Sequence, residues 1–197
     1  MSETDYIVLR KTPFRESSLI VSGISPEYGR LDFIMRGHSS GKKGKFSVAG
    51  LFRELHIEFK TKKEDLSGLL TAGKTELLEN HDSIAENLPG YMGACELSPV
   101  LLANVAAMVP VPETYQSLKL YLRSIQNGKA PEPYLSLVYL MFLHESGELP
   151  LQEGRAGDFL VHLLTEIANG NDIPDGIPES YWQKLREWRQ VICRKMK

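Results

Sequence analysis

The sequence predicts an α+β protein in which a small β-barrel comes first and an all-helical domain follows. Over the first 79 residues, short β-rich runs alternate with turn residues such as Pro, Gly and Ser. From residue 80 onward, apolar residues recur at helical spacing instead. Strands followed by helices, rather than alternating with them, are typical of α+β folds or of separate domains. We therefore predict two domains, residues 1–79 and residues 80–197.

Five short strands are predicted in the N-terminal domain. They cover Tyr6–Leu9, Ser18–Ser22, Arg30–Met35, Phe52–Phe59 and a run within Leu66–Leu78. The third and fourth alternate apolar with polar residues, which is the pattern of a half-buried strand. Short strands joined by turns favour a closed or partly open barrel, because closure removes the exposed edges of a sheet.

The C-terminal domain is predicted to be built from helices. They are expected over Ser83–Met108 with interruptions at Pro89 and Pro99, over Thr114–Gln126, from Pro131 to Ser146, over Arg155–Asn169 and from Glu179 to the end. The helix after Pro131 is apolar in every direction, so it belongs at the centre of a bundle. The last helix is either a second nucleic-acid contact or a solvated face, and its cations are Lys184, Arg186, Arg189, Arg194, Lys195 and Lys197.

The composition and charge of the chain argue against several classes of protein. The net charge of the chain is −2, and its two cysteines, Cys95 and Cys193, are too few for a disulfide framework or a structural zinc site. The acidic, polar start of the chain is unlike a signal peptide. No run approaches the ~20 apolar residues of a membrane span. We expect a reduced, cytoplasmic protein with no metal and no membrane association.

Positive charge is concentrated between Gly29 and Lys63. This window holds nine cations and three acids, and the cations are Arg30, Arg36, Lys42, Lys43, Lys45, Arg53, Lys60, Lys62 and Lys63. Three phenylalanines among them, Phe33, Phe46 and Phe52, are candidates for base stacking. Cations that track phosphates and rings that stack bases are what single-stranded nucleic acid requires. The alternative is a solvated loop between strands, with the phenylalanines in the core.

One motif of catalytic appearance is present. Gly68–Thr75 fits G-x-x-x-x-G-K-[ST], the phosphate-binding loop of many nucleotidases. That loop works only between a buried strand and a helix whose N-terminus receives the phosphates, yet the charged run Lys62–Asp65 precedes it. We predict that these residues belong to the fifth strand. Since no nucleophile or metal motif stands out elsewhere, we expect no enzyme and no cofactor.

A set of short motifs, in their order and spacing, resembles the RecO family of bacterial recombination mediators. The motifs are Tyr6–Leu9, Glu16-Ser17, Glu27–Leu31, Arg36-Gly37 followed by the basic loop, Leu51 before the fourth strand, and Cys95-Glu96-Leu97 on a helix. The resemblance implies an OB-fold barrel and a helical domain. It implies a non-catalytic DNA-binding protein of recombination and DNA repair that binds single- and double-stranded DNA, anneals strands and assists recombinase loading.

The resemblance also implies partners and positions. The expected partners are a RecR-like mediator and single-stranded-DNA-binding protein, and the expected place is the nucleoid in the bacterial cytoplasm. Arg30 and Arg36 fall on matching motif positions, whereas the lysines of Gly41–Lys45 match only as a basic loop. The chain lacks the four-cysteine zinc module that many members carry. The alternative function is a protein–protein adaptor on this scaffold that has lost DNA binding.

Overall fold

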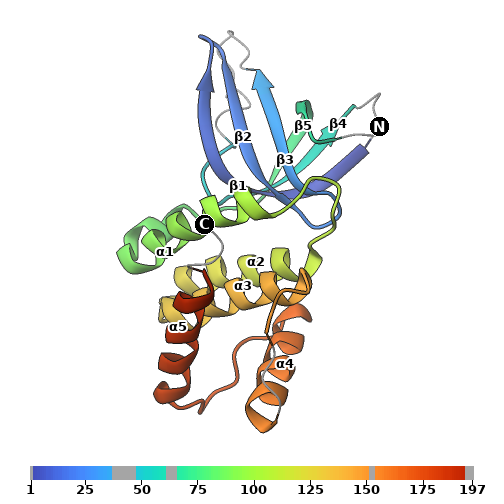
Figure 1. The fold of residues 1–197 in the computed structure, drawn as a ribbon. Helices are drawn as coiled ribbons and strands as arrows, with labels where there is room; N and C mark the ends of the chain where they lie inside the picture. The colour runs from blue at the N-terminus through green and yellow to red at the C-terminus, as the bar shows by residue number, and fades with distance from the viewer. Residues whose placement is uncertain (1, 37–47, 61–65, 151–153, 194–197) are drawn as a thin grey trace. The chain divides into compact units, whose positions relative to one another are not determined.

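The computed structural model describes residues 2–36, 48–60, 66–150 and 154–193. Within them the strands come first and the helices follow (Figure 1). The chain divides into two compact units. The barrel unit comprises Met1–Ser83 and Ser98–Val111, and the helical unit comprises Ile84–Leu97 and Pro112–Lys197. The predicted α+β class, with a five-stranded barrel before the helices, is confirmed.

The barrel is closed, with the strand order β1-β2-β3-β5-β4. Its strands are β1 (Ser2–Phe14), β2 (Ser18–Ser25), β3 (Gly29–Arg36), β4 (Glu54–Phe59) and β5 (Leu69–Glu79). All neighbours are antiparallel except β3 and β5, which run parallel. Because each strand has a partner on either side over part of its length, the barrel leaves little exposed sheet edge.

Strand β1 is longer than predicted because it serves both sides of the barrel. Its residues from Ser2 to Ile7 pair with β4, and those from Ile7 to Phe14 pair with β2. The strand continues past Leu9, where it was predicted to end, and runs through Pro13. Among the described strands, β2 alone pairs with β1 at that point, so the N–H that proline lacks can fall on the other side.

Three aromatic rings fill the centre of the barrel. Tyr6, Phe33 and Phe59 are fully buried, and Phe33 meets each of the other two edge to face with ring centroids 5.3 Å apart. The Tyr6 hydroxyl donates to the Leu31 carbonyl at 2.9 Å and lies 3.2 Å from the Val21 carbonyl. Burial raises the pKa of Tyr6 well above its ordinary value, so the hydroxyl stays a donor.

The segment Gly68–Thr75 is not a phosphate-binding loop. From Leu69 onward it forms β5, where Leu70 pairs with Phe33 and Thr75 pairs with Ile57. Its backbone N–H groups therefore point sideways along the sheet and do not converge on an anion. The prediction that these residues belong to the fifth strand is confirmed, so the match to the phosphate-binding motif does not correspond to a phosphate-binding loop.

The described helical segments are the short 3₁₀ helix η2 (Asp82–Glu86), α1 (Leu88–Asn104), α2 (Pro112–Gln126), α3 (Pro131–Glu145), α4 (Arg155–Ala168) and α5 (Glu179–Cys193). Pro89 falls in the first turn of α1, where proline is tolerated. The predicted interruption at Pro99 is wrong, because α1 runs through it. Leu97 and Leu101 on either side are buried, and their burial outweighs one lost helix hydrogen bond. Cys95, on the same helix, is exposed.

Helix α3 lies at the centre of the helical unit, as predicted. Every residue from Tyr134 to Leu143 is buried. At its end, the Glu145 carboxylate accepts hydrogen bonds from the backbone N–H groups of Glu113 and Thr114, each at 2.9 Å. It thereby satisfies two of the donors that the first turn of α2 leaves free. None of the described helices, α3 included, combines the length and apolar character needed to cross a bilayer.

The first residue of β3 must be glycine. Gly29 has φ +64°, in the left-handed region, and forms an isolated bridge with Ala107. A Cβ at this position would lie 2.3 Å from the Ala106 carbonyl oxygen and 2.4 Å from that of Val109. Both oxygens belong to backbone of the barrel unit, so neither can rotate out of the way.

Replacement of Gly29 by alanine is expected to lower the free energy of unfolding by at least about 2 kcal/mol, because it combines left-handed strain with two clashes. Gly68→Ala is the matched control, since nothing lies within 4 Å of a Cβ built there. That control should change stability by less than about 0.5 kcal/mol. Urea denaturation measures both, and equal midpoints for the two variants would contradict the prediction.

Candidate nucleic-acid interface

The outside of the barrel has two walls of opposite charge. Alternate residues of a strand point outward, and residues paired across strands share a face, so the register assigns each side chain to a wall. The basic wall consists of Arg10, Thr12, Phe14, Ser18, Ile20, Ser22, Arg30, Asp32, Ile34 and Arg36 on β1, β2 and β3. The acidic wall consists of Glu3, Asp5, His56, Glu58, Lys74 and Glu76 on β1, β4 and β5. The first wall is therefore more favourable for an anion than the second.

Four of the nine predicted DNA-contacting cations lie among the described residues. Lys42, Lys43, Lys45, Lys62 and Lys63 lie outside them, as does the stacking candidate Phe46. Arg36 is exposed at the end of β3, on the basic wall. Lys60 is exposed immediately after β4. These two have the exposure that a phosphate contact needs.

The side chain of Arg30 is held by the barrel unit itself. Its guanidinium donates to the Leu102 carbonyl at 2.7 Å and to the Asp32 carboxylate at 3.0 Å. Leu102 lies in the last turn of α1, where carbonyls have no helical partner. Arg30 therefore caps that helix end, as basic side chains commonly do. About a third of the side chain, 34%, remains exposed.

Arg53 is engaged more completely than Arg30. Its Nε donates to Asp82 Oδ1 at 2.8 Å and a terminal nitrogen binds Oδ2, so the pair is bidentate. The Arg53 hydrogen bond lowers the pKa of Asp82, and the same bond raises the pKa of Arg53. Arg53 and Lys60 flank opposite ends of β4, about 20 Å apart along the strand. The structure therefore does not bring these two cations together.

Two of the proposed stacking rings belong to the core. Phe33 is 0% exposed and Phe52 is 2% exposed. Phe33 lies on the inward side of β3, and Phe52 is buried ahead of β4 with φ +61°. Neither ring offers a face to a base without opening the barrel. Phe33 and Phe52 are therefore left out of the candidate interface. Their burial agrees with the alternative in which the phenylalanines belong to the core.

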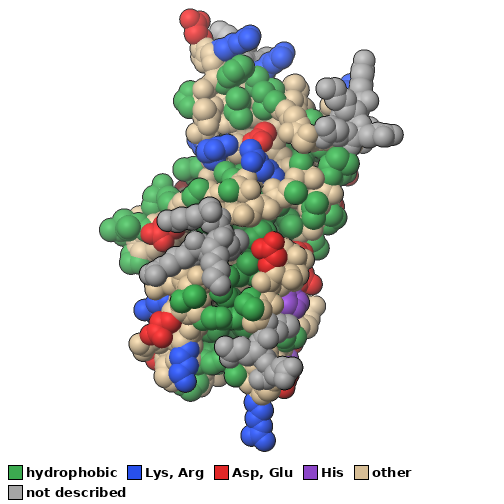
Figure 2. Space-filling model, viewed as in Figure 1, with side chains coloured by type: hydrophobic (Ala, Val, Ile, Leu, Met, Phe, Trp, Pro, Cys, Tyr) green, Lys and Arg blue, Asp and Glu red, His purple; other side chains and the backbone are tan. Residues whose placement is uncertain are grey.

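Sequence reasoning missed three side chains of the β1–β2 hairpin. Arg10 is exposed on the basic wall and donates to Ser22 Oγ at 3.3 Å. Phe14 is partly exposed at the end of β1, and the Arg15 guanidinium carbon lies 5.2 Å from its ring centroid. Figure 2 shows Lys and Arg side chains at the end of the barrel where β1 and β2 meet. The sequence signal that could have identified them is an aromatic residue, Phe14, that lies between cations and directly before a turn.

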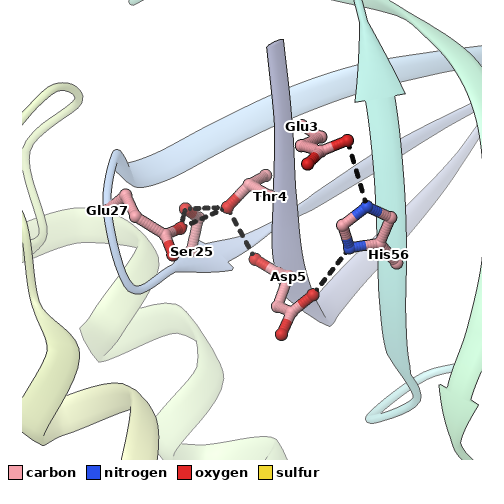
Figure 3. A network of polar contacts seen from close by, with 6 residues as sticks. All are labelled: Glu3, Thr4, Asp5, Ser25, Glu27 and His56. Atoms are coloured by element: carbon pink, nitrogen blue, oxygen red, sulfur yellow. Dashed lines mark hydrogen bonds and ion pairs between the residues drawn. The ribbon is translucent and has the colours of Figure 1, made fainter.

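The acidic wall is organised around His56 (Figure 3). Its Nδ1 lies 2.8 Å from an Asp5 carboxylate oxygen, and its Nε2 lies 3.7 Å from one of Glu3. The hydrogen bond to Asp5 is the main reason why the pKa of His56 is raised, and the charges of Asp5 and Glu3 add to it. Across the strand pair β4–β5, His56 lies opposite Glu76. The Glu76 carboxylate binds Lys74 Nζ at 2.6 Å. Carboxylates thus outnumber cations on this wall.

Comparison with known families bears on the same part of the chain. The family described as recombination protein O N terminal matches residues 1–76, which include nearly all of the barrel strands. The barrel is similar to the RecO N-terminal domain over these residues. The predicted resemblance to the RecO family is confirmed by this match, and the closed five-stranded barrel is its OB fold.

Curated relatives extend the likeness beyond the barrel. DNA repair protein RecO of Listeria monocytogenes serotype 4b is 26% identical over 153 residues, which cover 78% of this chain and 58% of the relative. DNA repair protein RecO of Aliivibrio fischeri is 26% identical over 144 residues, 71% of this chain and 56% of the relative. The chain therefore matches less than two thirds of the length of these RecO proteins.

The helical unit carries an apolar hollow between α4 and α5. Its volume is about 290 Å³, and it is lined by Ala156, Gly157, Leu160, Tyr181, Lys184, Leu185 and Trp188. The Tyr181 hydroxyl is buried without a hydrogen-bond partner among the described residues. Arg186 and Arg189 of α5 bind the Glu132 carboxylate of α3, at 3.5 and 2.9 Å. These two arginines therefore tie helices together and do not form a free cationic face.

The contacts of Arg30 predict that it matters more for stability than Arg36. Arg30→Ala removes a charged helix cap and leaves Asp32 without its partner, so it should cost about 1–2 kcal/mol of unfolding free energy. Arg36→Ala removes an exposed side chain and should cost less than about 0.5 kcal/mol. Urea denaturation of both variants under one condition makes the comparison. If the two variants unfold at the same urea concentration, the cap contributes nothing.

The raised pKa of His56 predicts a pH-dependent stability. Its stabilisation is fully present below about pH 6.5, the value for an unfolded histidine, and is lost as the pH rises through the higher folded-state pKa. Between about pH 6 and pH 8.5 the unfolding free energy of the wild type should therefore fall relative to that of His56→Gln. The difference should not exceed about 1 kcal/mol, because the ring is partly exposed.

A matched control for His56 lies on α4. His162 is exposed, and His162→Gln should keep the pH dependence of the wild type. Chemical denaturation at a series of pH values gives all three curves. The assignment fails if the His56→Gln curve runs parallel to that of the wild type.

Proposed function

We propose that this protein binds DNA on the basic wall of its barrel and acts as a non-catalytic mediator in recombinational DNA repair. One observation supports the proposal: the outward arginines of the described barrel strands lie on one wall beside a single carboxylate, Asp32, whereas Glu3, Asp5, Glu58 and Glu76 lie on the other wall, and this barrel matches the RecO N-terminal model. The matched relatives are named DNA repair protein RecO, which supports the same reading. Bacterial cytoplasm at the nucleoid is the place that follows from this function.

Phosphate contacts supply the affinity in this proposal. Arg10 and Arg36 are exposed on the basic wall, and Lys60 is exposed after β4. The predicted lysines Lys42, Lys43, Lys45, Lys62 and Lys63 add to this set. Each contact releases condensed counterions from the nucleic acid, so binding should not depend on base sequence but should weaken with salt. The carboxylates of Glu3, Asp5, Glu58 and Glu76 keep a strand off the opposite wall.

Annealing and partner binding complete the proposed role. Single- and double-stranded DNA are the proposed ligands, and a RecR-like mediator and single-stranded-DNA-binding protein are the proposed protein partners. The apolar hollow between α4 and α5 supports a protein contact in the helical unit, because its Trp188 and Leu160 line a cavity large enough for an apolar side chain. No step of this role requires bond making, so the proposal includes no catalytic residue.

A protein–protein adaptor without DNA binding is the second candidate. The same hollow favours it, as does the engagement of Arg30 and Arg53 in pairs with Asp32 and Asp82. The two candidates differ in one property, the salt-dependent affinity for single strands. That property distinguishes them directly.

Titration with a single-stranded oligonucleotide at several salt concentrations tests the proposal. The logarithm of affinity should fall with the logarithm of salt by about 0.7 per phosphate contact. The double variant Arg10→Ala, Arg36→Ala should bind more weakly and flatten that slope by about 1.4, since two contacts are lost. Lys74→Ala is the control, because it removes a cation from the acidic wall, where no strand is expected. Equal slopes for the wild type and the double variant would favour the adaptor.

The basic loop gives a separate test. Replacing Lys42, Lys43 and Lys45 together by alanine should lower the affinity and flatten the salt slope for any oligonucleotide sequence. Arg30→Ala should flatten the slope by less, because that guanidinium is already bound to Leu102 and Asp32. A triple variant with wild-type affinity and slope would make the loop a solvated turn.

A further inference from the structure

We propose that Phe14 is the residue of the barrel that stacks a base, and that Arg15 and Arg36 bind the phosphates beside it. This inference rests on the proposed DNA binding and assigns its stacking position. Phe14 is the last residue of β1, and it pairs with Ser18 of β2, which in turn pairs with Arg36 of β3. The three side chains therefore form one outward row across the end of the basic wall.

The row has the dimensions of a small nucleotide site. Neighbouring strands lie about 4.8 Å apart, so the Cα atoms of Phe14 and Arg36 are about 10 Å apart. Ser18 between them has a short, partly exposed side chain. Arg36 is exposed at one end of the row and Phe14 is partly exposed at the other. A base on the ring thus places its phosphates within reach of a cation.

The backbone at Arg15 supports a role for its side chain. Arg15 has φ +56°, in the left-handed region that glycine adopts without steric cost. Its guanidinium carbon lies 5.2 Å from the Phe14 ring centroid, a cation–π contact. Glycine would relieve the strain of the turn but would remove this cation. A guanidinium on one face of the ring leaves the other face for a base.

Among the described residues of the barrel, no other aromatic ring is available to stack a base. Tyr6, Phe33, Phe52 and Phe59 are buried in the core. Tyr28 packs edge to face on Phe59, with ring centroids 5.9 Å apart. Glu16 follows Arg15 in the hairpin turn and opposes its charge. The positive potential beside Phe14 therefore depends on Arg36 and Arg10 as well. Among the described barrel residues, Phe14 is the ring that has both exposure and adjacent cations.

Two oligonucleotide probes separate stacking from charge. One is a short thymidine oligonucleotide, and the other is the same backbone with abasic sites, which keeps the phosphates and lacks the bases. Phe14→Leu should weaken binding to the thymidine probe by about fivefold or more. Its affinity for the abasic probe and its salt slope should stay those of the wild type. Arg36→Ala should weaken both probes alike and flatten both slopes.

Arg15→Gly gives a second test with effects of opposite sign. It should raise the melting temperature, because the left-handed strain is relieved, and it should lower the affinity for both probes. Arg15→Lys keeps the positive charge and should retain more of the affinity for the abasic probe than Arg15→Gly does. Melting temperatures of all variants show whether the fold is kept.

The outcomes separate this inference from the proposed function. If Phe14→Leu binds the thymidine probe as the wild type does, or loses the same factor on both probes, Phe14 does not stack a base. DNA binding on the basic wall then still stands. If the wild type binds neither probe, the proposed function fails and the stacking role fails with it.

Discussion

The barrel depends on the ability of β1 to change hydrogen-bonding partner near its middle. The strand pairs with β4 up to Ile7 and with β2 from Ile7 onward, and a register shift between Val8 and Arg10 accompanies the change. Gly23 of β2 allows β1 and β2 to approach each other closely at this change of partner, since a Cβ on residue 23 would lie 2.0 Å from the Ile7 carbonyl oxygen. Closure in turn puts Tyr6 at the centre, where its hydroxyl reaches the carbonyls of two other strands.

The same change of partner separates the charges. Outward residues of β1 before the shift, such as Asp5, join the carboxylates of β4 and β5. Outward residues after it, such as Arg10, join the arginines of β3. One strand thus contributes to both walls, and a chain of nearly neutral total charge acquires a cationic side. Local fields of this kind direct association with a polyanion more than net charge does.

The sequence predicted the fold better than the site. Alternation and helical spacing located the five described strands and the regions of the described α-helices, because those patterns are local. Whether a given side chain is buried, in contrast, depends on tertiary structure and not on its neighbours in sequence. Phe33 and Phe14 look alike in sequence, yet barrel closure puts the first ring inside and leaves the second at a hairpin end. Arg30 and Arg36 share a strand, but only tertiary structure brings the Leu102 carbonyl to one of them. Charge density therefore located the region, and contacts decided which cations remain exposed.

The parallel pairing of β3 with β5 has a consequence for folding during synthesis. Asp32 pairs with Leu69, and Ser2 pairs with Phe59, so the barrel cannot close before β4 and β5 have left the ribosome. Translation proceeds at roughly 5–20 residues per second, which leaves the β1–β2–β3 sheet with open edges for several seconds. Pairings so distant in sequence also slow the closure itself. Until then the edges of β1 and β3 are the sites most exposed to association with another chain.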